Sequence, residues 1–191
     1  IPYNKLERGD LNDEEWTRFG QSVGRWAGAR LWIDATAALT PGQMAAKARR
    51  LYAEYGLDAI FVDYLGLMGV DEKTWSENHR ISLITAGLKR LAKELNVPVI
   101  ALSQLSRNVE ARQDKRPVLS DLRDSGSLEQ DSDVIIFLYR DEYYRPNTTE
   151  TPAQAEAIIA KHRNGPTGTA TLFFHAQRAA YRNLATREVA L

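Results

Sequence analysis

Three short runs of apolar residues constrain the fold of this chain more than any other feature. They span residues 59–62, 97–102 and 134–139. Continuous apolar runs of this length are typical of strands that are buried on both faces of a parallel sheet. Segments with apolar residues at helical spacing precede the first two runs. This alternation predicts an α/β protein with a mostly parallel sheet flanked by helices.

The predicted helices have clear start and stop signals. Apolar residues recur at helical spacing in three segments, residues 11–27, 41–55 and 81–95. Asn12 and Glu15 have the spacing of a capping box at the start of the first helix, and Thr40 and Gln43 have it at the start of the second. Gly56 is expected to end the second helix, because glycine is favoured just past a helix C-terminus.

The remaining segments predict further strands and a loop. Residues 155–163 and 168–175 flank the turn sequence Asn-Gly-Pro-Thr-Gly at residues 164–168, which predicts a C-terminal antiparallel hairpin. A short strand is also expected over residues 30–34. The polar segment 103–132 contains few residues that could join a core.

Composition limits the classes of protein. The chain has 191 residues, which suits one domain, and no cysteine, which excludes disulfides, iron–sulfur clusters and zinc–thiolate sites. No apolar run approaches the roughly 18–20 residues that span a bilayer, so we expect no membrane partner. The sequence lacks a signal-peptide pattern, and we expect a cytoplasmic protein. With 25 basic and 25 acidic residues, any nucleic-acid contact must come from local patches.

Polar residues follow the first two apolar runs. Asp63 comes directly after one run, and Gln104 follows the next run by two residues. Ligands of open α/β sheets bind at the carboxyl ends of the strands. If the two strands are neighbours, Asp63 could hold Mg²⁺ and Gln104 could contact a terminal phosphate. The alternative is a pair of solvated polar residues at strand ends.

The hairpin carries two cations. Lys161 and Arg163 are two residues apart on the predicted strand, so both point from one face, just before the turn. Such a pair could deliver positive charge to phosphates as an arginine finger does. Alternatively, the two side chains are solvated and protect an edge strand.

The polar middle of the chain has opposite charges in its two halves. Residues 106–117 are basic and include Arg107, whereas residues 120–133 are acidic apart from Arg123. The basic half, next to the Ser-Gly-Ser turn at residues 125–127, could contact nucleic-acid phosphates. A solvated loop is the alternative, because no aromatic residues are interleaved for base stacking.

A phosphate-binding loop is missing. No Gly-x-x-x-x-Gly-Lys-Ser/Thr sequence occurs in the 191 residues. A nucleotide site built only from Asp63 and Gln104 would lack most of its phosphate contacts. We therefore expect either a phosphate loop upstream of Ile1 or a protein that does not hydrolyse nucleotides.

Four blocks together resemble the RecA-like C-terminal motor domain of the bacterial replicative DNA helicase family, DnaB. They are residues 60–68, which resemble its Walker B segment, and residues 91–105, 121–131 and 161–168. The order and spacing of the blocks match the family, and the resemblance covers nearly the whole chain. It implies a RecA-like fold with a C-terminal antiparallel hairpin, lacking the N-terminal P-loop strand and helix.

The resemblance also implies an activity and residue roles. The family implies an ATP-driven homo-hexamer that moves 5′-to-3′ on single-stranded DNA at the replication fork. Asp63 would be the Walker B acid that holds Mg²⁺ through water, and Gln104 would sense the γ-phosphate of ATP. Arg163 would be the arginine finger for the neighbouring subunit's ATP, assisted by Lys161.

DNA and protein partners follow from the same resemblance. Arg123, Asp124 and Gly126 would lie in the loop that tracks one strand in the central channel, with Arg107 as a further DNA-binding candidate. Primase and a helicase loader would bind mostly through regions outside this chain.

The chain departs from the family at two positions. Asp124 stands where the family usually has glutamate, and Gly66 stands where glutamine is common. The family's Walker A loop and catalytic glutamate lie upstream of the position of Ile1. We therefore treat residues 1–191 as a partial motor domain and predict that the chain alone does not hydrolyse ATP. The alternatives are another RecA-like ATPase, such as a recombinase-type protein, and a non-enzymatic paralogue that binds DNA or caps helicase rings.

Overall fold

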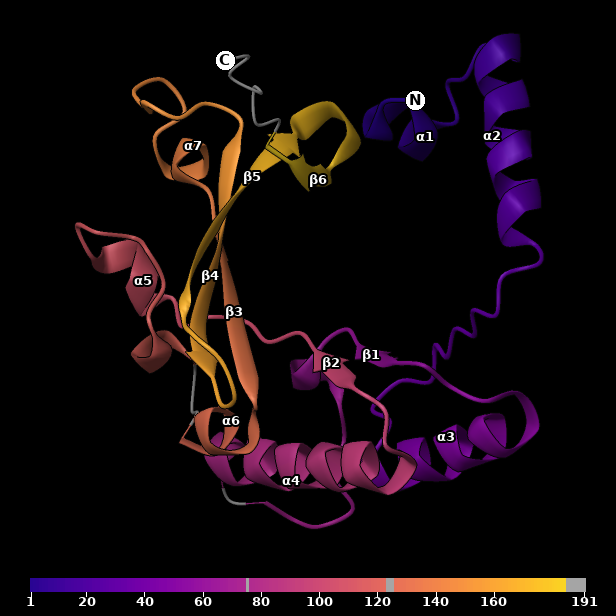
Figure 1. Cartoon of the computed structure of the whole chain (residues 1–191), viewed down its shortest axis with the longest axis vertical. Coiled ribbons are helices and arrows are strands. Elements are labelled where there is room, and N and C mark those ends of the chain that lie inside the picture. Colours follow the sequence, from indigo (N-terminus) through magenta and orange to yellow (C-terminus); the bar gives the residue numbers. More distant parts are fainter. Residues whose placement is uncertain (75, 123–125, 185–191) are drawn as a thin grey trace, which may run out of the picture. The chain divides into compact units, whose positions relative to one another are not determined.

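The structure is a computed structural model that describes residues 1–74, 76–122 and 126–184 (Figure 1). The chain divides into two compact units. The terminal unit comprises residues 1–35, 138–157 and the described part of 169–191. The central unit comprises residues 158–168 and the described part of 36–137.

The central unit contains most of the predicted α/β elements. Its elements are α3 (Pro41–Tyr55), β1 (Ile60–Val62), the 3₁₀ helix η1 (Leu65–Leu67), α4 (Glu77–Leu95), β2 (Val99–Ala101), α5 (Asn108–Ala111), the 3₁₀ helix η2 (Leu119–Asp121) and α6 (Gly126–Asp131). It also holds the first four residues of β3 (Val134–Tyr139) and the last five of β4 (Gln154–His162). The central unit contains every candidate site residue that the structure describes.

The terminal unit contains both described ends of the chain. Its elements are α1 (Tyr3–Arg8), α2 (Asp13–Trp26), α7 (Asp141–Tyr144), β5 (Gly168–His175), the 3₁₀ helix η3 (Ala176–Arg178) and β6 (Ala180–Asn183). The Lys5 ammonium donates to both carboxylate oxygens of Glu15, at 3.0 and 2.9 Å, and so joins α1 to α2. This hydrogen bond lowers the pKa of Glu15.

The predicted helix starts are confirmed. At α2, the Glu15 amide donates to the Asn12 side chain at 2.8 Å, and the Asn12 amide donates to Glu15 at 3.1 Å. Thr40 and Gln43 form the same reciprocal pair at α3, at 3.3 and 3.1 Å. Gly56 follows α3 with a φ of +73°, a conformation that glycine adopts without strain.

The strands form two sheets. β1 and β2 pair in parallel, with Val62 opposite Ala101. The other sheet has the order β3–β4–β5–β6, and β5 and β6 are antiparallel. The predicted hairpin of residues 155–163 and 168–175 is confirmed as β4 and β5, which are neighbours in this sheet. The fourth strand, β6, was not predicted, because residues 180–183 are short and have no alternating pattern.

Three predictions are wrong. Residues 30–34 form no strand in the described chain, because neither sheet includes this segment and a strand exists only through bonds to a neighbour. The apolar strands are not buried on both faces: Phe61 of β1 is 71% exposed, and burial alternates along β3. The polar segment 103–132 does contribute to the core, through Val109, Leu122 and Leu128.

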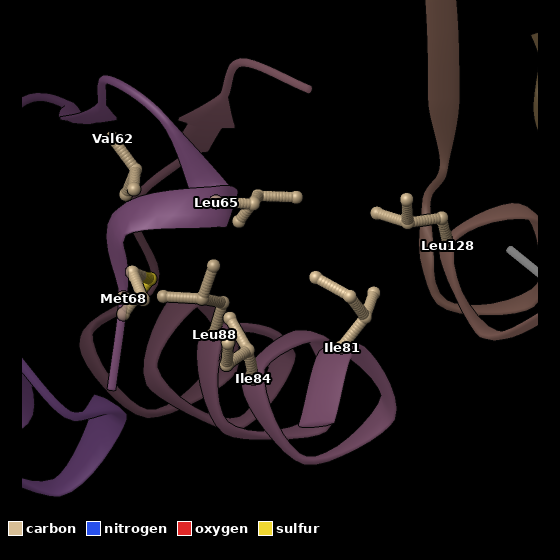
Figure 2. Close-up of a cluster of buried hydrophobic side chains, with 7 residues drawn as sticks. All are labelled: Val62, Leu65, Met68, Ile81, Ile84, Leu88 and Leu128. Atoms are coloured by element: carbon tan, nitrogen blue, oxygen red, sulfur yellow. The ribbon is translucent and has the colours of Figure 1, made fainter. Parts of the chain in front are cut away.

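The core of the central unit forms around α4. One apolar cluster joins α4 to β1, η1 and α6, and Figure 2 shows Leu65 and Met68 above Ile84 and Leu88, with Leu128 facing Ile81. Its members are Val62, Leu65, Met68, Ile81, Ile84, Leu88 and Leu128. A separate cluster packs α3 on α4. Burial of apolar surface stabilises a fold by about 25 cal/mol per Å². Because this cluster joins α4 to both neighbours, α4 is the scaffold that holds the end of β1 and the start of α6.

A glycine allows α3 to approach α4. A Cβ atom at Gly87 of α4 would lie only 2.5 Å from the Cβ of Pro41, the first residue of α3. No real side chain tolerates that separation, so the close packing of the two helices requires glycine at this position. Among the described helices, none is long and apolar enough to cross a membrane.

Candidate nucleotide and DNA site

Parallel pairing brings the ends of β1 and β2 together. The Leu102 amide donates to the Val62 carbonyl at 2.9 Å, and the Leu65 amide donates to the Leu102 carbonyl at 3.0 Å. The backbone therefore stays paired on both sides of Asp63, and Gln104 leaves the sheet at the same edge. The two strands are neighbours, which is the condition that the candidate site required. Both side chains are exposed and accessible to a ligand.

The donor set at this edge fits magnesium only as part of a larger coordination shell. Among the described residues, no group of three or more acidic or histidine side chains is arranged so that it could hold a metal ion. Asp63 therefore supplies one carboxylate. Mg²⁺ in nucleotide sites is typically held by one or two carboxylates, with phosphates and waters completing the octahedron. A single exposed carboxylate is compatible with that arrangement.

Arg80, which belongs to none of the recognised motifs, supports the turn that follows Asp63. From α4 its guanidinium donates to the Met68 carbonyl at 2.5 Å and to the Gly66 carbonyl at 3.4 Å. Glu77 binds the same guanidinium, with one contact at 2.8 Å, and raises the pKa of Arg80. The i,i+3 spacing of Glu77 and Arg80 was the only available sequence signal.

The departure at Gly66 has a local explanation. A Cβ atom built at Gly66 would lie 2.4 Å from the ring of Tyr64. The Tyr64 ring therefore occupies space that a longer residue at position 66 would need. The observed orientation of the Tyr64 ring therefore requires a residue without a side chain at position 66.

The two hairpin cations bind the C-terminal end of α6. The Lys161 ammonium donates to the Glu129 carbonyl, and the Arg163 guanidinium donates to the Gln130 carbonyl at 3.1 Å. Consecutive carbonyls are contacted, so both side chains lie on one side of the hairpin, as predicted. The last carbonyls of a helix carry partial negative charge and lack intrahelical partners, which explains why cations bind there.

Asp133 holds Arg163 at two points. Its carboxylate lies 3.2 Å from the Arg163 guanidinium, and its backbone carbonyl accepts from the Arg163 amide at 2.8 Å. The same carboxylate also accepts from the Lys89 ammonium on α4. The hydrogen bond from Lys89, aided by the charges of Lys89, Arg163 and Lys161, lowers the pKa of Asp133. In the sequence, Asp133 stands out only as one member of an acidic stretch.

The described residues around the predicted DNA loop adjoin this cation site. Arg123 and Asp124 lie outside the described residues. Gly126 is the first residue of α6, and Arg107 is exposed at the start of α5. The Thr85 hydroxyl on α4 donates to Asp131 at 2.6 Å and anchors the far end of α6. One short helix thus connects the predicted DNA-loop residue Gly126 to the carbonyls that bind Lys161 and Arg163.

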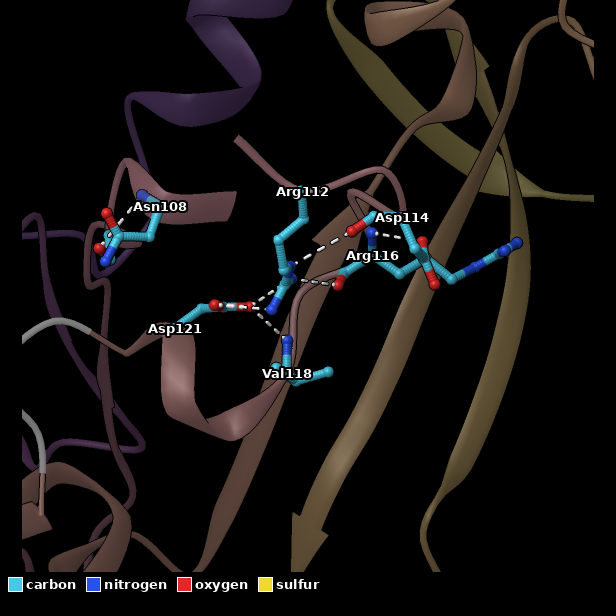
Figure 3. A network of polar contacts seen from close by, with 7 residues as sticks. Asn108, Arg112, Asp114, Arg116, Val118 and Asp121 are labelled. Atoms are coloured by element: carbon cyan, nitrogen blue, oxygen red, sulfur yellow. Dashed lines mark hydrogen bonds and ion pairs between the residues drawn. The ribbon is translucent and has the colours of Figure 1, made fainter. Parts of the chain in front are cut away.

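The basic loop, residues 106–117, is held by hydrogen bonds of its own and is not simply solvated (Figure 3). The Arg112 guanidinium donates to both carboxylate oxygens of Asp121, at 3.0 and 2.7 Å. It also donates to the Arg116 carbonyl at 2.8 Å. The Lys115 ammonium donates to the Glu110 carbonyl at 2.6 Å. Part of the positive charge in residues 106–117 therefore organises the loop itself.

Comparisons with known proteins match this architecture. The sequence profile of the family described as "DnaB-like helicase C terminal domain" matches residues 1–183. The chain is 49% identical over 181 residues to the replicative DNA helicase DnaB of Buchnera aphidicola subsp. Schizaphis graminum, covering 94% of this chain. It is 46% identical over 188 residues to the replicative DNA helicase DnaC of Bacillus subtilis (strain 168), covering 98% of this chain.

Solved structures give the same result. A DnaB-like replicative helicase, studied with its interactions with primase, superimposes with a TM-score of 0.90 at 42% identity, covering 97% of this chain and 45% of that chain. A second solved structure, that of an ATPase domain, also gives a TM-score of 0.90 at 42% identity, covering 97% of this chain and 66% of that chain.

The match covers only part of the relatives. The chain spans 39% of the length of the Buchnera protein and 41% of the Bacillus protein. Within that span, the family profile, the sequence relatives and the solved structures agree. The chain belongs to the DnaB-like helicase C-terminal domain family.

Proposed function

We propose that the complete gene product carrying this chain is a replicative DNA helicase. It hydrolyses ATP, moves 5′-to-3′ on single-stranded DNA and separates the duplex at the replication fork in the cytoplasm. The observation that carries the proposal is the parallel register of β1 and β2 in a chain of this family, because it sets Asp63 and Gln104 at one sheet edge. Ligands of α/β sheets bind at such an edge.

Asp63 and Gln104 have complementary roles toward ATP. Asp63 would hold Mg²⁺ through water. The metal, when bound, would supply positive charge that neutralises the phosphates. The Gln104 amide donates to the γ-phosphate and, being neutral, accepts equally well from water after the phosphate leaves. Gln104 therefore distinguishes the nucleotide before and after hydrolysis.

Arg163 and Lys161 act on the ATP of the neighbouring subunit in a homo-hexamer. Both are cations beside a tight turn, and half of the Arg163 side chain is exposed. A guanidinium that approaches the γ-phosphate stabilises the charge that develops as the phosphoryl group leaves. In the single chain, the α6 carbonyls and Asp133 orient both groups.

DNA binds through the segment between β2 and α6. Arg107 and Arg123 neutralise phosphates of one strand, and backbone groups near Asp124 and Gly126 follow the same strand. Six copies of the loop share this work, which is consistent with a net charge of zero for the chain. Primase and a loader bind the assembled protein.

Complementation between two inactive variants tests the shared active site. In the complete gene product, Asp63→Asn and Arg163→Ala each abolish magnesium-dependent ATP hydrolysis and unwinding of a forked duplex. Mixed rings regain part of the hydrolysis, because some interfaces pair an intact Asp63 with an intact Arg163 of the neighbour. The exposed cation Arg50 on α3 provides the control, Arg50→Ala, which keeps wild-type activity. Mixed rings with no activity would show that Arg163 does not act on a neighbour.

A further inference from the structure

The base of the loop that follows Gln104 is closed by an ion pair between a buried carboxylate, Asp121, and a partly exposed guanidinium, Arg112. Asp121 is only 4% exposed, and Arg112 binds both of its carboxylate oxygens, at 3.0 and 2.7 Å (Figure 3). The Val118 amide donates to the same carboxylate at 2.8 Å. A two-point contact between a guanidinium and a carboxylate defines both the distance and the orientation of the two groups.

The backbone closes the loop at the same place. The Ser106 amide donates to the Asp121 carbonyl at 2.8 Å, and Leu105 forms an antiparallel bridge with Leu122. Leu122 is buried beside Ile135 and Phe137 of β3. Leu105 comes directly after Gln104, and Leu122 comes directly before residue 123. The closed base therefore links the residue after the phosphate sensor to the residue before the predicted DNA contacts.

Arg112 also holds the tip of the loop. Its guanidinium donates to the Arg116 carbonyl at 2.8 Å and to the Asp114 carbonyl at 3.3 Å. With Asp121 included, one side chain connects both the tip and the base. Arg112 thus has the partners of a structural group within the loop rather than those of a free phosphate ligand.

We propose that Arg112 and Asp121 are positioning residues that couple ATP hydrolysis to DNA binding. This inference rests on the proposed function. The pair keeps the segment after Gln104 against the segment that enters the DNA loop, so a displacement of Gln104 on loss of the γ-phosphate moves both segments together. Arg112 itself does not bind DNA. The loop transmits the change because its closed base moves as one piece.

Two substitutions that remove charges of opposite sign distinguish a positioning role from a purely electrostatic effect on DNA affinity. Asp121→Asn removes a negative charge and Arg112→Gln removes a positive charge, and each breaks the same contact. If charge alone governed DNA affinity, the first variant would bind oligo(dT) more tightly and the second more weakly. A positioning role predicts that both variants need a higher oligo(dT) concentration for half-maximal stimulation of ATP hydrolysis. The matched control is Arg50→Gln, which removes the charge of an exposed arginine on α3.

The measurements use the complete gene product with ATP, Mg²⁺ and oligo(dT). We expect both variants to keep the basal kcat within about twofold, and the oligo(dT) concentration for half-maximal stimulation to rise about tenfold or more, as for a misplaced catalytic segment. Arg112→Lys keeps the charge without the two-point contact and gives an intermediate result. Hydrogen exchange at the Ser106 and Val118 amides quickens in both variants, whereas the α4 amides keep their protection and report an intact fold.

The outcomes are distinguishable. A wild-type protein without DNA-stimulated hydrolysis would contradict the proposed function, and this inference with it. A stimulated wild type whose Asp121→Asn and Arg112→Gln variants respond like Arg50→Gln would contradict this inference alone. Opposite shifts in oligo(dT) affinity for the two variants, with full stimulation, would also overturn it. If both substitutions unfold α4, the Arg112→Lys variant takes their place, and its half-maximal oligo(dT) concentration is compared with that of Arg50→Gln.

Discussion

The carboxylate of Asp133 lies 3.2 Å from the guanidinium of Arg163, and the Asp133 carbonyl accepts from the Arg163 amide at 2.8 Å. The two residues are 30 positions apart in the chain, at the start of β3 and the end of β4. The sheet brings these ends together, because β3 and β4 are neighbours in it. The proposed arginine finger is therefore oriented by a residue that no motif identifies.

Asp133→Asn should separate activity from stability. Both groups are about half exposed, and surface ion pairs contribute about 0–1 kcal/mol, so the free energy of unfolding should change by no more than that. ATP hydrolysis of the complete gene product should fall, because Arg163 loses a partner that orients it. Denaturant unfolding and steady-state hydrolysis measure the two effects. Asp58→Asn, at an exposed aspartate before β1, is the control, and equal activity of both variants would refute the role of Asp133.

The same carboxylate should make stability depend on pH. The folded-state pKa of Asp133 is lowered, chiefly by the hydrogen bond from Lys89. Its stabilising contribution is thus fully present above the unfolded-state pKa of about 3.9 and is lost as the pH falls through the folded-state value. The difference in unfolding free energy between wild type and Asp133→Asn should shrink from pH 7 to below about pH 4. A difference that grows in acid would contradict this assignment.

Ile84 should be a main determinant of folding. It is 0% exposed at the centre of the cluster that joins α4 to β1, η1 and α6. Ile84→Ala should lower the free energy of unfolding by about 2–5 kcal/mol, because the substitution leaves a cavity in a packed core. Leu67→Ala, at an exposed leucine of η1, should change it by less than about 0.5 kcal/mol. Denaturant midpoints of the two variants would test this, and equal values would contradict it.

Gly66→Gln, which installs the residue common in the family, should be destabilising in this chain. The new side chain overlaps the Tyr64 ring, which must shift, and an off-rotamer side chain costs about 0.5–1.5 kcal/mol. The loss should be smaller when Tyr64→Ala is also present, since the ring is the obstacle. A double-mutant cycle of unfolding free energies measures this coupling. Strictly additive values would show that the ring and position 66 do not compete.

The 191-residue chain on its own should not hydrolyse ATP. It has no phosphate-binding Gly-x-x-x-x-Gly-Lys-Ser/Thr sequence, and Asp63 and Gln104 cannot replace the backbone amides and lysine of such a loop. Phosphate release measured with ATP and Mg²⁺ should stay at the level of a buffer blank. Turnover that disappears in the Asp63→Asn chain would contradict this expectation, since it would show a complete site within these residues.

Several features of the protein were determined by the sequence alone, because they depend on neighbouring residues. The capping boxes at Asn12 and Thr40, the stop at Gly56 and the runs that form β1, β2 and β3 are local patterns. The motif blocks identified the family for the same reason: their residue types and spacing are fixed along the chain. The expectation that Asp63 and Gln104 lie at the ligand-binding edge followed from general rules for parallel sheets, on the condition that the two strands are neighbours.

Which polar and charged groups meet depends on the folded chain. The chain has 25 basic and 25 acidic residues, and many pairings are conceivable. Packing of α4, α6 and the sheet brings together two particular pairs, Arg112 with Asp121 and Asp133 with Arg163. Thr85 and Asp131, which are 46 positions apart, meet for the same reason. No spacing rule predicts such pairs, since their geometry arises only after the chain has folded. The wrongly predicted strand at residues 30–34 and the open face of β1 have the same explanation, because pairing and burial are properties of neighbours in space rather than in sequence.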